Sequence, residues 1–193
     1  MRRRLVYVGL QIILFQGCSY YTYNPADVDN LPNLYDRRIG QVAIIDESIE
    51  INAREALNND LIIPYQSHIN INVYNGTLLV TGEALDEGVN KQILEKVRIL
   101  QGVKRVQDEI VDAPETHASS QANDSLTTNR IKTELDNIHD LAYFSSANIK
   151  VITENGSVYL MGLVYKEEAD RVTSVVQQVP GVTKIVRLFE YLP

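Results

Sequence analysis

Few residues of this chain have the types and spacings that catalysis requires. The three histidines, His68, His117 and His139, are far apart, and none belongs to an HExxH or G-x-S-x-G motif. The acidic pairs Asp108-Glu109 and Glu167-Glu168 are adjacent in sequence, which favours solvated charges over an acid–base dyad. A single cysteine cannot build a thiolate zinc site. We therefore expect no enzymatic activity, no cofactor, no metal site and no small-molecule substrate.

The residue with the clearest chemical role is Cys18, the only cysteine. It follows a cationic start, Arg2 to Arg4, and an apolar run from Leu5 to Phe15. This is the layout of a secretory signal, and the run is shorter than the roughly 20 apolar residues of a membrane span. Gly17 directly before the cysteine resembles the bacterial lipobox, in which the thiol is acylated, for example with palmitate. The alternative is an accidental thiol that ends an ordinary signal peptide.

The lipobox resemblance implies that residues 1–17 are removed as a signal peptide and that Cys18 becomes the lipid anchor. Lipoproteins with Asp after the cysteine usually stay at the inner membrane, and here that position is Ser19. The resemblance therefore implies a lipid-anchored protein of the outer membrane that faces the periplasm. Several acyl chains bury enough methylene groups to hold such an anchor stably.

The charge of the chain argues against nucleic acid as a partner. The formal net charge is −7, and removal of Arg2, Arg3 and Arg4 with no acidic residue takes the mature chain to −10. Nucleic-acid phosphates require a basic surface, so we expect no binding to DNA or RNA.

The mature sequence repeats itself at an offset of 80 residues. Asn75-Gly76 returns as Asn155-Gly156, and Gly82 returns as Gly162. Apolar residues share the offset: Ile69, Ile71, Leu78 and Val80 correspond to Ile149, Val151, Val158 and Leu160. Two copies of one small domain explain this self-similarity.

Each copy is predicted to have the element order αββαβ. In the first copy we expect a helix at 48–59 with Ser48 as its N-cap, strands at 69–73 and 77–81 joined by a tight Asn-Gly turn, a helix at 86–100 and a strand at 103–111. In the second copy we expect a helix at 125–139, a hairpin at 148–161, a helix at 166–178 and a strand at 183–191. The order predicts an α+β fold, with two helices on a three-stranded sheet in each copy.

The expected organisation follows from these elements. A signal peptide (1–17) precedes an acylated tether (18–46) and the first domain (47–112), and a polar linker (113–124) leads to the second domain (125–193).

A pair of αββαβ units with Asn-Gly hairpins, a glycine that closes the second strand and Gly-Val before the last strand resembles two BON domains. With a lipobox in front, the chain resembles the dual BON-domain outer-membrane lipoproteins over about residues 12–193. The stretch VITENGSVYLMGLV (151–164) is closest to their pattern. The resemblance implies that outer-membrane phospholipid is a partner. It also implies that the second domain contacts anionic lipid through its first helix and that the first domain is mainly structural.

Carried over to this sequence, the resemblance implies a phospholipid contact made by one face of the helix that begins near residue 123. Ile131 and Leu135 are expected in the core, and Asp136 stands where the family pattern has leucine. Arg130 is open to two interpretations, as a lipid contact or as a solvated charge. The implied contact residues are Leu126, Thr127, Asn129, Arg130, Thr133 and Glu134.

Two functions follow from the sequence. The first is a non-enzymatic outer-membrane lipoprotein that binds anionic phospholipid through the second domain and supports envelope integrity. The alternative is a periplasm-facing scaffold that docks onto outer-membrane assembly proteins or another envelope complex, because exposed strand edges in small sheets suit such docking.

Overall fold

The structure is a computed structural model that describes residues 37–38, 40–113 and 118–193, all of which belong to one compact unit. The predicted signal peptide, Cys18 and most of the predicted tether lie outside these residues. Within the described residues, no helix combines the length and apolar character needed to cross a bilayer.

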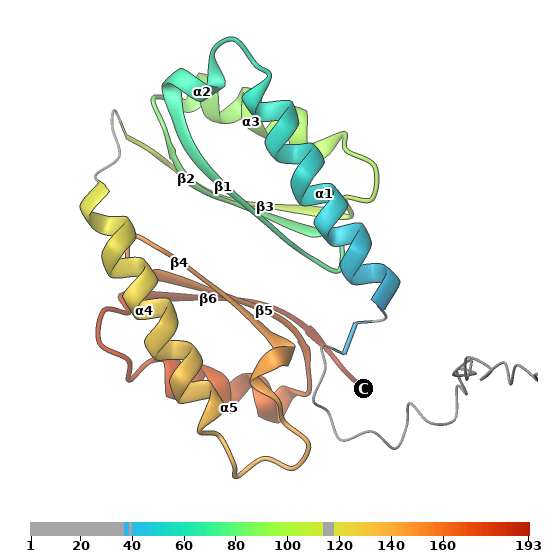
Figure 1. The fold of residues 1–193 in the computed structure, drawn as a ribbon, viewed down its shortest axis with the longest axis vertical. Coiled ribbons are helices and arrows are strands. Elements are labelled where there is room, and N and C mark those ends of the chain that lie inside the picture. The colour runs from blue at the N-terminus through green and yellow to red at the C-terminus, as the bar shows by residue number, and fades with distance from the viewer. Residues whose placement is uncertain (1–36, 39, 114–117) are drawn as a thin grey trace, which may run out of the picture. The chain divides into compact units, whose positions relative to one another are not determined.

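The first domain packs two long helices on a three-stranded sheet. Strand β1 pairs with β2 in antiparallel fashion, and helix α3 carries the chain across to β3, which pairs with β2 in parallel. Figure 1 shows α1 and α3 on the same face of this sheet. The elements are α1 (Gly40–Asn58), α2 (Ile63–Gln66), β1 (Ser67–Tyr74), β2 (Thr77–Ala84), α3 (Glu87–Arg98) and β3 (Arg105–Asp112).

The second domain repeats this topology in a sheet of its own, with the order β4-β5-β6. Helices α4 and α5 cover one face of it (Figure 1). Two separate sheets confirm the predicted α+β repeat. The elements are α4 (Ala118–Asp136), η2 (Ser146–Asn148), β4 (Ile149–Glu154), β5 (Ser157–Val164), α5 (Lys166–Val176) and β6 (Lys184–Tyr191).

The two hairpin turns confirm the prediction from the Asn-Gly pairs. Asn75 and Gly76 have φ of 48° and 77°, and Asn155 and Gly156 have φ of 48° and 73°. Two successive residues with positive φ form the turn whose twist suits a two-residue hairpin. The register of both hairpins follows from these turns, so the strands of the two copies pair at equivalent positions.

The first helix of each domain begins earlier than predicted. Helix α1 begins at Gly40 rather than at Ser48, whose hydroxyl donates to the carbonyl of Ile44 in the preceding turn and does not cap the helix. Helix α4 begins at Ala118 rather than at 125, so residues 118–124 of the predicted linker are helical. Each extension places a buried aspartate, Asp46 or Asp124, against the hairpin of its own domain.

Each domain has its own hydrophobic core between its helices and its sheet. In the second domain Ile131 and Leu135 are 0% and 1% exposed, which confirms that these residues of α4 belong to the core. In the first domain Ala53 and Leu57 of α1 hold the corresponding places.

A third apolar cluster joins the two domains. It contains Tyr74 and Leu79 from the first domain and Tyr159 and Met161 from the second, and all four are buried. Polar bonds reinforce it: Asn70 Nδ2 donates to Glu154 Oε2 at 2.7 Å, Lys150 Nζ donates to Glu50 Oε1 at 2.5 Å, and the Leu163 amide donates to Tyr74 Oη at 3.2 Å. The described residues therefore form two cores and one interdomain contact.

Candidate functional site

Over residues 122–136, helix α4 has a buried stripe and an exposed face. Asp124, Thr127, Ile131 and Leu135 are buried at spacings of three, four and four residues, which is the period of one helix face. Five of the six residues implied to contact lipid lie outside this stripe and are exposed: Leu126, Asn129, Arg130, Thr133 and Glu134. Leu126 is 54% exposed, although leucine is usually buried.

Thr127 is the exception among the six. Its side chain is 4% exposed, and it packs against Gly181 so closely that a Cβ added to Gly181 would lie 2.6 Å from Thr127 Oγ1. Thr127 therefore supports the turn before β6 and cannot contact a bilayer. The spacing of Thr127, Ile131 and Leu135 places all three on one helix face, so periodicity alone could have excluded Thr127 from the contact surface.

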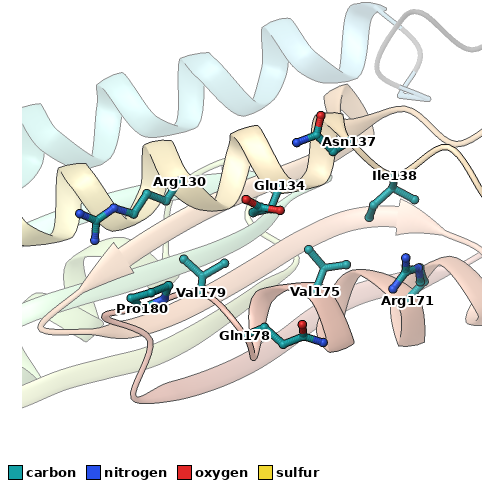
Figure 2. Close-up of a pocket in the computed structure, with 9 residues that line it drawn as sticks. All are labelled: Arg130, Glu134, Asn137, Ile138, Arg171, Val175, Gln178, Val179 and Pro180. Carbon is teal, nitrogen blue, oxygen red and sulfur yellow. The ribbon is translucent and has the colours of Figure 1, made fainter.

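A groove runs between α4 and α5 beside the exposed face (Figure 2). Its volume is about 420 Å³, and buried Ile138 and Val179 form part of its wall. Figure 2 shows Arg130 and Glu134 on the α4 side, one turn apart, and Arg171, Val175 and Gln178 on the α5 side. The complete lining is Arg130, Glu134, Asn137, Ile138, Arg171, Val175, Gln178, Val179 and Pro180.

A second hollow, of about 340 Å³, lies at the N-terminal part of α4. Arg130 lines both this hollow and the groove between α4 and α5. Leu126 lines this second hollow together with the hairpin glycine Gly156 and with Gly181. Leu126 and Arg130 are one helical turn apart, so an exposed apolar side chain stands next to an exposed cation.

Arg130 keeps its charge available to a ligand. Among the described residues Arg130 forms no ion pair, whereas Arg171 across the groove is held by Asp140, with 2.9 Å between Nε and Oδ2. Glu134 lines the same groove, and its negative charge lowers the attraction of the groove for an anion. The pair that suits an anionic amphiphile is therefore Leu126 with Arg130, at the end of the groove away from Asp140.

Asp136 lies at the last turn of α4 and accepts a hydrogen bond from the hydroxyl of Ser146. Ten residues separate it from Leu126, a rise of about 15 Å along a helix. Charges in solvent are screened over about 8 Å at physiological salt, so Asp136 weakens anion contact at its own end of the helix more than at Leu126.

Groups that could support other chemistry do not gather in the described parts of the chain. Across residues 37–38, 40–113 and 118–193, no three His, Cys, Asp or Glu side chains form a group that could hold a metal ion.

The protein is a two-domain α+β repeat protein with two αββαβ domains in tandem. In each domain the first helix binds the Asn-Gly hairpin of the same domain. The BON domain model matches residues 45–113 and 123–193. These matches cover most of the chain. The chain therefore belongs to the BON-domain family and contains two copies of the domain.

The chain is similar to curated proteins of two bacteria. It is 27% identical over 157 residues to the outer membrane lipoprotein DolP of Haemophilus influenzae, covering 81% of this chain and 80% of that protein. It is also 27% identical over 157 residues to a 21 kDa hemolysin of Actinobacillus pleuropneumoniae, with 81% and 79% covered. Among solved structures, the C-terminal domain of CdsD, a structural protein of the type III secretion system of Chlamydia trachomatis, matches 80% of this chain and 100% of that chain at 18% identity. Its TM-score is 0.31, which supports no conclusion about function.

Proposed function

We propose that this chain is an outer-membrane lipoprotein, anchored at Cys18 and facing the periplasm, that contacts anionic phospholipid through the exposed face of α4 and supports envelope integrity. The proposed contact residues are Leu126, Asn129, Arg130, Thr133 and Glu134. The observation that carries the proposal is the exposed Leu126 one turn from Arg130, which forms no ion pair with any residue that the structure describes. The similarity to a protein named as an outer membrane lipoprotein supports the location.

The corresponding face of the first domain lacks this combination. Asp46 and Asp124 hold equivalent hairpins, so Ser48 of α1 corresponds to Leu126 and Asn52 corresponds to Arg130. Residues 40–113 contain 12 acidic and 6 basic residues, a net charge of −6, whereas residues 118–193 contain 9 and 7, a net charge of −2. Both differences favour the second domain as the part that approaches an anionic surface.

The contact is expected to be weak by itself. Burial of a half-exposed leucine contributes about 1 kcal/mol, and one arginine near an anionic bilayer contributes about 1 kcal/mol more. A total of about 2 kcal/mol is roughly a 30-fold preference, which is enough to orient an anchored body but too little to hold a free one. The acyl chains at Cys18 would provide the remaining affinity.

Flotation of residues 19–193 with anionic vesicles tests the proposal. These residues include both cores and lack the anchor. We expect partial flotation at low salt, lost at high salt, and no flotation of a Leu126→Glu, Arg130→Glu variant. A matched variant, Lys91→Glu with Gln92→Glu, makes the same change of −3 in charge on the exposed face of α3 and should float like wild type. Equal flotation of all three proteins would place the lipid contact elsewhere.

The anchor has its own test. A Cys18→Ala variant should remain an unprocessed or mislocalised precursor that takes up no fatty-acid analogue in cells. Equal labelling of the variant and wild type would contradict anchoring at Cys18.

A scaffold that docks onto outer-membrane assembly proteins is the second candidate. The observation in its favour is the exposed apolar connection between α1 and β1, where Leu61 and Tyr65 are 89% and 86% exposed. If wild-type protein does not float with anionic vesicles, this function takes first place.

A further inference from the structure

Two consecutive arginines just before α1 contact different domains. Arg37 reaches the second domain, where its Nη1 and Nη2 donate to the two carboxylate oxygens of Glu168 at 2.5 and 2.7 Å. Arg37 Nη1 also donates to the carbonyl of Leu163 at 3.1 Å. Arg38 stays with the first domain, where its Nη1 donates to Asp46 Oδ2 at 2.6 Å. We call residues 37–38 the strap.

Both guanidinium groups are largely buried and lie over aromatic rings. Arg37 lies 5.2 Å from the centre of the Tyr165 ring, and Arg38 lies 4.1 Å from the centre of the Tyr74 ring. The side chains of Arg37 and Glu168 are 9% and 5% exposed. Breaking a buried, bidentate pair leaves an uncompensated buried charge. Its loss therefore destabilises the structure much more than the loss of a surface pair does.

The strap shares residues with the interdomain contact. Leu163 of β5 donates its amide to Tyr74 Oη in the first domain, and its carbonyl accepts from Arg37. Tyr74 lies beneath Arg38 and belongs to the apolar cluster that joins the domains. The hydrogen bond between Leu163 and Tyr74 is therefore contacted from both sides: Arg37 binds Leu163 and Arg38 lies over Tyr74.

Other ion pairs between the domains are less enclosed. The side chains of Lys150 and Glu50 are 30% and 15% exposed, and those of Lys184 and Glu109 are 58% and 16% exposed. Exposed pairs contribute little because water screens them. Within the described residues, the strap therefore provides the most buried charge pairing that reaches from the N-terminal side of the chain into the second domain.

We propose that the strap is a lock: it holds the two BON domains in one arrangement and fixes the point at which the chain toward Cys18 leaves the body. The segment that attaches the protein thus also sets its internal geometry. This inference uses neither Leu126 nor Arg130, so it stands or falls separately from the proposed lipid contact.

Hydrogen exchange of the full-length protein in detergent, followed by mass spectrometry, tests the lock. In an Arg37→Gln, Arg38→Gln variant, the peptide that contains Leu163 should exchange about tenfold faster or more, the factor expected when a charged hydrogen bond is lost. Peptides from the two cores, around Ile93 in α3 and Leu135 in α4, should keep their protection, because the partners of the strap lie in α1, β5 and α5.

Arg187→Gln is the matched control, because it removes one arginine whose partner, Asp170, lies in the same domain and is 60% exposed. It should exchange like wild type at Leu163. Equal exchange in the strap variant and in this control would overturn the lock. If the double variant also loses core protection, Arg37→Lys decides, since lysine keeps the charge but cannot form the bidentate pair. Faster exchange at Leu163 with protected cores supports the lock, and unchanged exchange overturns it.

Discussion

Asp46 in the first domain and Asp124 in the second hold equivalent hairpin turns. Each carboxylate accepts from the backbone N–H groups of both residues of an Asn-Gly turn, at 2.6 and 2.8 Å for Asp46 and at 2.7 and 2.9 Å for Asp124. The two aspartates are 78 residues apart and the turns are 80 apart, so the repeat extends into the first helix of each domain. In the second domain, the hydrogen bonds of Asp124 connect α4 to the hairpin and thereby orient the exposed face of α4.

Asp124→Asn should destabilise the protein. Asparagine offers one acceptor oxygen where the carboxylate offers two, so one turn N–H loses its partner in a site that is 8% exposed. We expect the free energy of unfolding to fall by about 1–3 kcal/mol, as for other buried donors left without an acceptor. Urea denaturation measures the change, and Asp112→Asn at an exposed position serves as the control. Equal stability of the two variants would contradict the role of Asp124.

Gly82→Ala should be among the most damaging single substitutions in the first domain. Gly82 has a φ of 117°, and a Cβ there would overlap the carbonyl of His68 on the paired strand. Backbone must then shift, and we expect a loss of more than about 2 kcal/mol in the free energy of unfolding. Gly40→Ala, with no atom within 4 Å of the added Cβ, should be neutral or stabilising. Thermal unfolding of the two variants compares them, and similar melting temperatures would refute the close approach at Gly82.

Glu154 should make stability depend on pH. Burial raises the pKa of its carboxyl group, the hydrogen bond from Asn70 opposes this rise, and the charges of Asp124 and Glu83 add to it while His68 lowers it. Because the folded-state pKa lies above the ordinary value of 4.5, the folded protein takes up a proton before the unfolded chain does. This group therefore stabilises the fold as the pH falls from neutral toward 4.5.

Glu154→Gln is expected to raise the melting temperature at pH 7, because the amide keeps an acceptor for Asn70 without a desolvated charge. It should also reduce the gain in stability between pH 7 and pH 5. Glu95→Gln on the exposed face of α3 should change neither quantity. A wild-type pH dependence retained in Glu154→Gln would assign the effect to another group.

Leu126→Trp offers a direct view of the proposed lipid contact. The chain contains no tryptophan, so the variant has a single indole, a group that favours the membrane interface. Its emission should shift to shorter wavelength with anionic vesicles as the ring leaves water. Leu61→Trp in the first domain, at a residue that is 89% exposed, should show no shift. A shift for Leu61→Trp alone would move the contact to the first domain.

Local signals in the sequence were sufficient for the hairpins and for most helices and strands. Asn75-Gly76 and Asn155-Gly156 specify tight turns because both residues tolerate positive φ. Asp86 caps α3 by accepting from the amide of Val89, three residues along the chain. Such signals involve neighbours in the chain, so periodicity and turn chemistry reveal them.

Contacts between distant residues were not predictable in this way. Asp46 was assigned to the tether because its partners, the amides of Asn75 and Gly76, come 29 and 30 residues later. Thr127 was assigned to the lipid contact from the family resemblance. Its spacing from Ile131 already indicates the buried helix face, but only the structure reveals its packing partner, Gly181, at the other end of the domain.

The sequence by itself determined the two copies of the αββαβ unit, their Asn-Gly turns and the core positions Ile131 and Leu135. Only the tertiary structure decided what covers the second face of each sheet. Strands β2 and β5 are buried on both faces at nearly every position. Each has a continuous apolar run in its middle, Leu78–Val80 in β2 and Val158–Met161 in β5, and such runs show no period that distinguishes one face from the other. Side chains such as Leu79 and Met161 acquire a partner only when the two domains meet, because a strand presents the same apolar face to any surface that can bury it.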